Sequence, residues 1–297
     1  KPITENIIEA TAIETLQELG WEYMPGIAIS PGAEEEERDN YEQVILIDRL
    51  HKAVAELNPD IPVDAREQAI QKVLRINSPD LLHNNETFHT MLVEKVKIPY
   101  HENGYERSHE VMLIDFDLPE QNHFLVVNQF TIVENNQNKR PDMLLFVNGI
   151  PLIVFELKNA ADQNATIKKA YDQIQTYKAT IPGLFTYNAI CVISDGIECK
   201  AGSVSSGFTR FMSWKTIDGK KDASRFTPLM VTLLSGMMNH ITLLDLIRNF
   251  ILFEKNKKED SKTGINQIVT EKKIAAYHQY FAVNKAFQST IVASGIN

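Results

Sequence analysis

Apolar residues recur at helical spacing through the first third of the chain. Between Thr4 and Leu19 they fall three or four positions apart, with Thr4 placed to cap a helix and Gly20 placed to end it. After the break at Ser30-Pro31-Gly32, the same spacing predicts a long helix over 34–57 and shorter helices over 64–76 and 87–96. The region up to about residue 96 is therefore predicted to be mainly helical.

From Lys97 the pattern changes to short runs rich in β-branched and aromatic residues. These runs predict strands over 111–116, 124–133, 143–147, 152–157 and 189–194. Before the last of them, apolar residues from Ile167 to Tyr177 return to helical spacing, and Pro182-Gly183 ends that helix. The order predicts an α/β fold in which a central mixed sheet is flanked by helices, beside the helical N-terminal region.

A polar stretch divides the C-terminal part of the chain. Residues 254–263 are almost purely polar, which is typical of a linker, and 272–293 has the pattern of a helix. We therefore expect one domain over 1–253 and a linker over 254–270. The domain is expected to comprise the helical part to about 96, a core over about 97–215 and a second helical part over about 225–253.

Composition narrows the functional classes. The fractions of hydrophobic residues (43%) and charged residues (23%) are ordinary for a folded protein, and a net charge of −9 restricts any nucleic-acid contact to a local surface. No apolar run reaches the length of a membrane span and no signal peptide begins the chain, so a cytoplasmic protein without a membrane partner is predicted. Cys191 and Cys199 alone make neither a disulfide framework nor a zinc site, and no H-E-x-x-H or G-x-S-x-G motif occurs.

The stretch over 140–159, RPDMLLFVNGIPLIVFELKN, carries the most chemistry. Two apolar runs flank Asn148-Gly149, the strongest short signal for a β-hairpin. Asp142 stands at one open end and Glu156 and Lys158 at the other, with no charged residue between the two acids. Antiparallel pairing therefore brings three charges together at the mouth of an apolar hairpin.

The register of this hairpin decides whether the acids can meet. A strict two-residue turn pairs Glu156 with Pro141 and puts Asp142 on the other face. A bulge or a three-residue connection pairs Glu156 with Asp142 instead, and Pro151, which has no N–H to donate, favours such an irregularity. We therefore predict a shifted register.

Two acids held among apolar strands favour a bound cation. Mg²⁺ binds through a few carboxylates together with water and phosphate oxygens, and it lowers the pKa of a bound water. Lys158 shares a strand face with Glu156 and can orient that water. The D-x(13)-E-x-K spacing alone, however, is more typical of a surface salt bridge.

The helix after the hairpin adds polar groups. Gln173 and Tyr177 are one turn apart, so both can face Glu156 and position a substrate backbone or Lys158, although Tyr177 alone also fits an ordinary core residue. Because neither group binds magnesium well, substitutions there are expected to lower the activity of the site more than its metal affinity. Basic residues that could hold phosphates surround this region: Lys139, Arg140, Lys158, Lys168, Lys169 and Lys178.

The run PDMLLFVNGIPLIVFELKN, followed by QIQTY, resembles the PD-(D/E)xK nuclease motif of the R (HsdR) subunits of type I restriction enzymes. Further similar segments occur in the family's order along nearly the whole chain: LLHNNETFHTMLVEKV, LIDFDLPEQNHFLVVNQFTI, ATIKKAYDQIQTYK, AICVISDGIECKAGS, WKTIDG and IAAYHQYFAVNKA. The resemblance implies a restriction-endonuclease-like core and Mg²⁺-dependent cleavage of double-stranded DNA.

The family's site residues carry over position by position. The resemblance makes Asp142 and Glu156 the metal ligands and Lys158 the catalytic lysine, and it places the family's Q-x-x-x-Y pair on Gln173 and Tyr177. Nucleases of this fold often add a glutamate from an early helix. Glu5 and Glu14 are the two candidates.

In the family, an ATP-driven DNA motor follows the nuclease domain, and partner subunits read the site (S) and methylate it (M). No G-x-x-x-x-G-K-[ST] phosphate loop occurs in this chain, so 271–297 is expected to be only the start of the motor region. Gln279 is either part of an adenine-contacting element or an ordinary glutamine on a helix surface. ATP would act in the motor, and S-adenosylmethionine only through the partner subunits.

Two other functions fit the same residues. A stand-alone repair or junction-resolving nuclease of this fold would need no motor, and the motor-like C-terminus argues against it. A catalytically silent DNA-binding or assembly module would not need Asp142, Glu156 and Lys158 intact. Loss of a Mg²⁺-dependent activity on substitution of Glu156 separates an enzyme from such a module.

Overall fold

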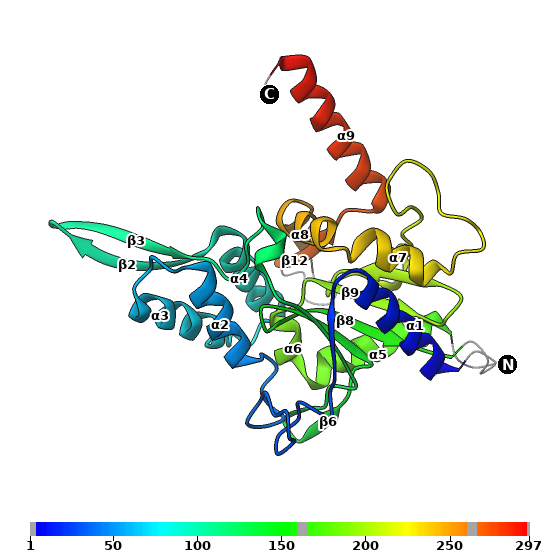
Figure 1. Cartoon of the computed structure of the whole chain (residues 1–297), viewed down its shortest axis with the longest axis horizontal. Coiled ribbons are helices and arrows are strands. Elements are labelled where there is room, and N and C mark those ends of the chain that lie inside the picture. Colours follow the sequence, from blue (N-terminus) through cyan, green and yellow to red (C-terminus); the bar gives the residue numbers. More distant parts are fainter. Residues whose placement is uncertain (1–3, 160–165, 260–265, 296–297) are drawn as a thin grey trace.

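A six-stranded mixed sheet forms the centre of the computed structural model, which describes residues 4–159, 166–259 and 266–295 (Figure 1). β1 runs parallel to β4 and β8 runs parallel to β9, whereas the other neighbours are antiparallel. In spatial order the strands are β1 (Glu22–Pro25), β4 (Phe124–Asn128), β7 (Met143–Val147), β8 (Ile150–Leu157), β9 (Ile190–Ser194) and β10 (Cys199–Gly202). The predicted α/β class with a central mixed sheet is confirmed.

Helices cover both faces of this sheet. One face packs against α1 (Glu5–Glu18), α7 (Leu229–Met237) and α8 (His240–Asn249), and the other against α5 (Ile167–Thr180) and α6 (Pro182–Thr186). Leu145 and Phe155 join the first core, whereas Leu144 and Val154 join the second. Successive side chains of a strand point to opposite faces, so a strand covered on both sides is buried throughout and largely apolar. All eight residues of β8 are accordingly buried.

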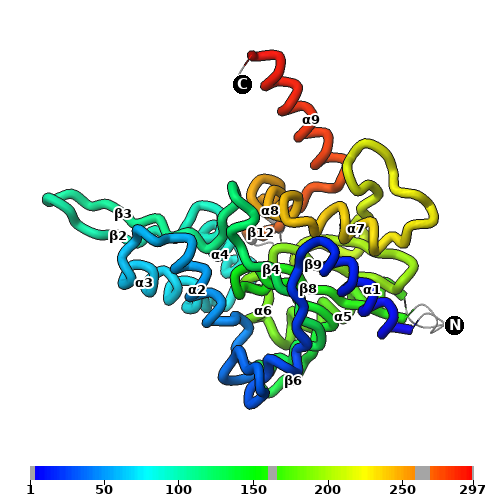
Figure 2. Tube along the Cα trace, viewed as in Figure 1, coloured from blue at the N-terminus to red at the C-terminus, as the bar shows by residue number. Residues whose placement is uncertain are grey.

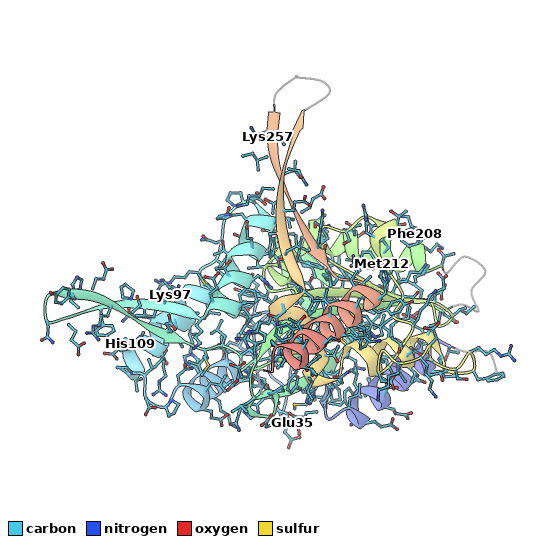
Figure 3. The ribbon with its side chains drawn as sticks, turned by 90° about the horizontal axis from the view of Figure 1, so that it is seen from above. Glu35, Lys97, His109, Phe208, Met212 and Lys257 are labelled. Carbon is cyan, nitrogen blue, oxygen red and sulfur yellow. The ribbon has the colours of Figure 1, made fainter. Side chains whose placement is uncertain are left out.

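The N-terminal part adds three helices and a hairpin beside the sheet. The helices are α2 (Ile47–Leu57), α3 (Val63–Leu74) and α4 (Leu81–Glu94), and the strands are β2 (Val96–Glu102) and β3 (Tyr105–Val111). This hairpin, which carries Lys97 and His109, extends well away from the body (Figures 1 and 3). The helices predicted over 4–19, 64–76 and 87–96 are confirmed, although α4 begins earlier, after the capping carboxylate of Asp80.

The helix predicted over 34–57 was wrong in its first half. α2 begins only at Ile47, and the preceding chain is a series of turns. The side chain of Asn40 accepts the backbone N–H groups of Glu42 and Gln43, at 3.0 and 3.1 Å. Such local hydrogen bonds from an asparagine offer the backbone an alternative to the helix.

Two strand predictions also needed correction. The run over 111–116 is not a strand, because β3 ends at Val111 and the Asp115 carboxylate then accepts the N–H groups of Asp117 and Leu118 in a turn. The run over 124–133 is interrupted at Gln129, which has a φ of 51°. It continues as a separate short strand paired with the next one: β5 (Ile132–Glu134) and β6 (Gln137–Lys139).

The polar stretch expected to be a linker lies largely in a further antiparallel strand pair. Residues 254–259 and 266–270 lie in β11 (Ile251–Glu259) and β12 (Asn266–Ile274), and 260–265 lie outside the described residues. The ribbon projects from the body with Lys257 near its far end (Figure 3). Its polarity reflects exposure of a paired ribbon rather than absence of structure.

The C-terminal helix also starts later than predicted. Lys272 belongs to β12, and the helix is α9 (Tyr277–Ser294), which leaves the body along most of its length (Figures 1 and 2). The Lys272 side chain is buried instead and donates to the Asn85 carboxamide at 2.9 Å and to the Asn188 carbonyl at 2.7 Å. Burial lowers the pKa of Lys272 to about 7.

Two short 3₁₀ helices, η1 (Pro119–Gln121) and η2 (Phe208–Arg210), complete the described elements. No single described helix is long and apolar enough to cross a membrane. The helices α7 and α8 reach that length and composition only together, across a break bent by 70°. Cys191 and Cys199 are free thiols in the interior.

Candidate active site

The β7–β8 hairpin has the shifted register that the site requires. Asn148 and Gly149 have positive φ angles of 53° and 79°. A tight two-residue hairpin turn needs positive φ at both of its central residues, and Asn-Gly adopts these angles readily. Next to the turn Phe146 pairs with Pro151, but beyond it Leu145 pairs with Ile153, so one residue of β8 is extra. The predicted bulge beside Pro151 is confirmed.

The bulge places the two acids opposite each other. The pairing of Met143 with Phe155, continued by one residue, sets Asp142 against Glu156. The Asp142 carboxylate accepts the backbone N–H of Leu157 at 2.7 Å, which fixes it across the end of β8. The convergence expected from the sequence is therefore present.

Both carboxylates are nearly sealed from solvent. The exposed fraction is 7% for Asp142 and 2% for Glu156. Burial raises the pKa of Asp142, and the Leu157 N–H and the charge of Lys158 offset part of that rise. Burial and then the charge of Asp142 raise the pKa of Glu156 to about 8. Two desolvated acids that repel each other make this end of the hairpin costly without a positive charge.

Lys158 supplies one positive charge. Its ammonium contacts the Glu156 carboxylate and donates to the carbonyl of Leu157 at 3.1 Å. Burial on its own lowers the pKa of Lys158, but the neighbouring charges of Glu156 and Asp142 outweigh burial, and the net shift is upward. Lys158 therefore stays protonated beside the two acids, on the same side of the strand as predicted.

Helix α5 brings Tyr177 to the same acids. The Tyr177 hydroxyl lies 3.0 Å from Oε2 of Glu156 and 3.4 Å from the carbonyl of Arg140, and it is also hydrogen-bonded to Gln173. Tyr177 is only 4% exposed. The ring therefore belongs to the core, as one interpretation of the sequence has it, and the hydroxyl faces Glu156 as predicted, whereas a role in positioning DNA or Lys158 stays a prediction. The loop before α5 lies largely outside the described residues.

Two of the lysines that could hold phosphates instead contact neighbouring side chains of α5. Lys168 pairs with Asp172 one turn along α5, and Lys178 donates to Gln175 at 2.9 Å. Burial lowers the pKa of Lys178. Of the basic residues around the hairpin, Lys158 is the one whose ammonium contacts a catalytic candidate in the structure.

A third acidic side chain, which the sequence did not single out, lies beside the site on α1. Glu9 accepts hydrogen bonds from the side-chain amides of Asn128, at 2.7 Å, and Gln129, at 2.8 Å. Of the two predicted candidates, Glu5 lies near enough for its charge to raise the pKa of Asp142, whereas Glu14 is exposed on the helix. The i, i+4 spacing of Glu5 and Glu9 was the available signal.

The donor set fits one divalent cation with few protein ligands. Asp142 and Glu156, set opposite each other at the end of the hairpin, form the candidate pair. Among the described residues no group of three or more acidic, His or Cys side chains could hold a metal ion. Magnesium is commonly held by one or two carboxylates plus waters and substrate phosphates. A divalent charge would also offset the burial that raises both carboxyl pKa values and the charge of Asp142 that raises the pKa of Glu156 further.

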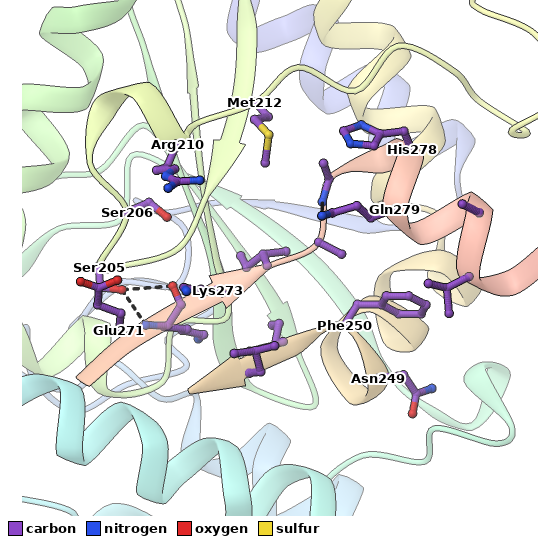
Figure 4. Close-up of a pocket in the computed structure, with 18 of the residues that line it drawn as sticks. Ser205, Ser206, Arg210, Met212, Asn249, Phe250, Glu271, Lys273, His278 and Gln279 are labelled. Atoms are coloured by element: carbon purple, nitrogen blue, oxygen red, sulfur yellow. Dashed lines mark hydrogen bonds between the residues drawn. The ribbon is translucent and has the colours of Figure 1, made fainter. Parts of the chain in front are cut away.

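A pocket of about 980 Å³ lies apart from this site, between the 205–212 segment, β12 and the start of α9 (Figure 4). Gln279 lines it, and its carboxamide oxygen accepts the Ala276 N–H at 2.9 Å, which caps α9. The helix-surface interpretation of Gln279 accounts for this contact.

Comparison with known proteins identifies the family. Residues 2–210, which contain all five predicted site residues, match the family model of the type I restriction enzyme R protein N terminus. The chain belongs to this family.

Relatives of this R-protein family match over nearly the whole chain. It is 39% identical to the type I restriction enzyme HindI endonuclease subunit of Haemophilus influenzae over 98% of this chain and 27% of that protein. It is 32% identical to a putative type I restriction enzyme endonuclease subunit, MjaIXP, of Methanocaldococcus jannaschii, over 96% of this chain and 27% of the relative. The chain thus spans about a quarter of the length of these curated relatives.

Proposed function

We propose that this chain is the nuclease part of a type I restriction R subunit, with a restriction-endonuclease-like PD-(D/E)xK core that hydrolyses phosphodiester bonds of double-stranded DNA in the presence of Mg²⁺. The observation that carries the proposal is the bulged register of β7 and β8, which sets Asp142 opposite Glu156 with Lys158 in contact. A surface salt bridge would need neither the bulge nor the burial of both acids.

Each residue of the site has a role that follows from its contacts. Asp142 and Glu156 would hold the metal ion, and Lys158 would offset charge on the phosphate group from its place beside Glu156. Tyr177 fixes one oxygen of Glu156, and Gln173 supports the Tyr177 hydroxyl. Magnesium bound by the two acids would lower the pKa of an attacking water and neutralise developing charge on the phosphate.

The remainder of the R subunit would supply the other activities. The relatives are named endonuclease subunits of type I restriction enzymes, and this chain covers 27% of the length of the first two. In the full subunit we expect cleavage to be coupled to ATP-driven DNA translocation, with methylation and site recognition in M and S subunits. S-adenosylmethionine would enter only through those partners.

The test uses the full-length subunit assembled with its M and S partners and an unmethylated plasmid carrying the recognition site. Separate substitutions Asp142→Ala, Glu156→Ala and Lys158→Ala should abolish cleavage with Mg²⁺ and ATP while DNA-stimulated ATP hydrolysis continues. Glu198→Ala is the matched control, because Glu198 forms an ion pair with Lys200 at the same spacing, at 3.0 Å, outside the site. Normal cleavage by Glu156→Ala would contradict the proposal and favour a non-catalytic module.

A further inference from the structure

Gln129 occupies an unusual position at the end of β4. The regular pairing of β4 with β7 ends at Asn128 and Met143, and the next residue, Gln129, adopts a left-handed backbone conformation with φ of 51°. Its N–H nevertheless still donates to the carbonyl of Asp142 at 2.9 Å. Non-glycine residues rarely adopt positive φ, and such conformations persist where surrounding contacts hold them.

The left-handed turn lets two consecutive side chains reach the same carboxylate. In an extended strand, Asn128 and Gln129 would point to opposite faces. Here the Asn128 amide donates to one oxygen of Glu9 at 2.7 Å and the Gln129 amide donates to the other at 2.8 Å. Tyr23 donates to the Asn128 carboxamide oxygen at 3.2 Å, so the orientation of that amide is determined.

The Gln129 amide also faces Asp142. Its nitrogen lies 3.4 Å from Oδ1 of Asp142, whereas the Leu157 N–H donates to the other carboxylate oxygen, Oδ2. An amide nitrogen has two N–H groups, one for each carboxylate. Gln129 thus connects Asp142, which directly precedes β7, to Glu9 on α1, and it contacts Asp142 through both its main chain and its side chain.

The end of β1 supports this turn from behind. The N–H of Gly26 donates to the Asn128 carbonyl at 2.9 Å. A Cβ atom at Gly26 would approach the carbonyl oxygens of Asn128 and Gln129 to 2.4 and 2.8 Å, so only glycine fits. The Asn128–Gln129 segment is therefore clamped between β1 and β7.

We infer that Gln129 is a positioning residue that sets the metal affinity of the active site by holding Asp142 and Glu9 in fixed orientation. The inference rests on the proposed function, because it assigns Asp142 to the metal. Groups that orient a ligand without binding the ion commonly change metal affinity or activity about 10- to 100-fold when removed. Gln129 differs from Tyr177 because it contacts Asp142 rather than Glu156 and because it reaches α1.

The experiment removes the side chain and keeps the backbone. Gln129→Gly suits this purpose, since glycine adopts positive φ without strain. Asn136→Gly is the matched control, because Asn136 has a φ of 61° in the exposed β5–β6 turn. Gln129→Asn is a second variant that tolerates the left-handed conformation and keeps an amide too short to bridge both acids.

Three measurements are made on the full-length subunit. They are Mn²⁺ binding by electron paramagnetic resonance without DNA or ATP, the Mg²⁺ concentration for half-maximal plasmid cleavage by the complex, and thermal unfolding in EDTA. We expect Gln129→Gly to weaken Mn²⁺ binding and raise the half-maximal Mg²⁺ concentration by about tenfold. Cleavage should recover at high Mg²⁺, and Asn136→Gly should match the wild type.

Failure of this inference is distinguishable from failure of the proposed function. Wild-type Mn²⁺ affinity and Mg²⁺ dependence in both Gln129 variants, with cleavage abolished in Glu156→Ala, would overturn the positioning role alone. A lower unfolding temperature with unchanged metal dependence would likewise overturn it, because that result describes a purely structural residue. If Glu156→Ala cleaves normally, the proposed function fails, whereas the Mn²⁺ measurement still decides whether Gln129 controls a metal site.

Discussion

The hydroxyl of Tyr177, on α5, lies 3.0 Å from Oε2 of Glu156, which stands near the end of β8. The other Glu156 oxygen contacts Lys158, so both oxygens are oriented by side chains of this chain. Replacing the hydroxyl with hydrogen leaves the packing of the ring intact and frees one of these two oxygens.

We therefore expect Tyr177→Phe to fold normally and to cleave about tenfold more slowly or worse, measured in single-turnover plasmid cleavage. Because the hydroxyl touches a carboxylate that would bind the metal, Mn²⁺ affinity should fall too, in contrast to the expectation from helix spacing alone. Tyr171→Phe on the same helix is the control, since its hydroxyl bonds to the Ser206 carbonyl at 3.2 Å. Wild-type cleavage by Tyr177→Phe would show that the hydroxyl serves the core only.

Glu156→Gln should stabilise the metal-free protein while removing cleavage. Burial and the charge of Asp142 raise the pKa of Glu156 to about 8, so the folded state binds this proton more tightly than the unfolded chain does. Stability therefore falls as pH rises from the ordinary glutamate range towards 8, and glutamine escapes that loss. In EDTA at pH 8 we expect an increase of at least about 2 °C in the unfolding midpoint, which about 1 kcal/mol produces in a large domain.

The gain should shrink towards pH 5, where Glu156 is protonated in the folded protein. Glu198→Gln, at a side chain that is 45% exposed, serves as the control and should leave the midpoint unchanged. An equal or lower midpoint for Glu156→Gln at pH 8 would mean that the carboxylate is not destabilising the metal-free site.

Two Asn-Gly turns provide a comparison of backbone strain with steric clash. Gly149 and Gly104 have φ angles of 79° and 81°, but a Cβ at Gly149 would lie 2.4 Å from the carbonyl oxygen of Leu46, whereas a Cβ at Gly104 meets nothing within 4 Å. Gly104→Ala should lower the free energy of unfolding by about 1 to 2 kcal/mol because of the left-handed backbone alone. Gly149→Ala should lower it further, by at least about 1 kcal/mol, because the start of α2 packs against the turn. Urea unfolding measures both, and equal losses would contradict the clash.

Lys272 predicts a pH dependence of stability in the opposite direction to that of Glu156. Burial lowers its pKa to about 7, so between pH 7 and the ordinary lysine range the unfolded chain binds the proton more tightly. The free energy of unfolding should therefore rise from pH 7 to 8.5, by up to about a tenfold change in the folding equilibrium per pH unit. Lys272→Met should remove this rise.

Lys273→Met is the control for Lys272, because Lys273 is the next residue on β12 and is 51% exposed. It leaves the other titrating groups in place and should keep the wild-type slope. A wild-type slope in Lys272→Met, measured by urea unfolding at several pH values, would show that the lysine titrates outside this range.

The local part of the site could be predicted from the sequence, and the long-range part could not. The turn at Asn148-Gly149, the irregular position of Pro151 and the i, i+4 spacing of Gln173 and Tyr177 are short-range signals, and each led to a contact that the structure contains. The bond between Gln129 and Glu9 joins residues 120 positions apart, so no periodic pattern shows it. In hindsight, the polar pair at Asn128-Gln129 interrupts an apolar run and marks the place.

The same distinction explains the errors in the fold. The helix over 34–57 was predicted from helical spacing, and its first half, like the linker predicted over 254–270, is largely polar. A polar run, however, is equally compatible with turns stabilised by Asn40 and with an exposed ribbon. Lys272 was placed at the start of a predicted helix, and its buried hydrogen bond to Asn85 joins residues 187 positions apart. Tertiary contacts of this range override local preference.

The extra residue in β8 also limits how the hairpin can change length. Side chains alternate between the two faces, so inserting or deleting one residue between Asp142 and Glu156 turns every later side chain of β8 over. Glu156 and Lys158 would then point away from Asp142, and alternate β8 residues would exchange the two cores. Only changes in steps of two residues, or a single change compensated by loss or gain of a bulge, preserve the acid pair. The number of residues between Asp142 and Glu156 therefore decides whether the two acids share a face, and the bulge beside Pro151 places them on the same face.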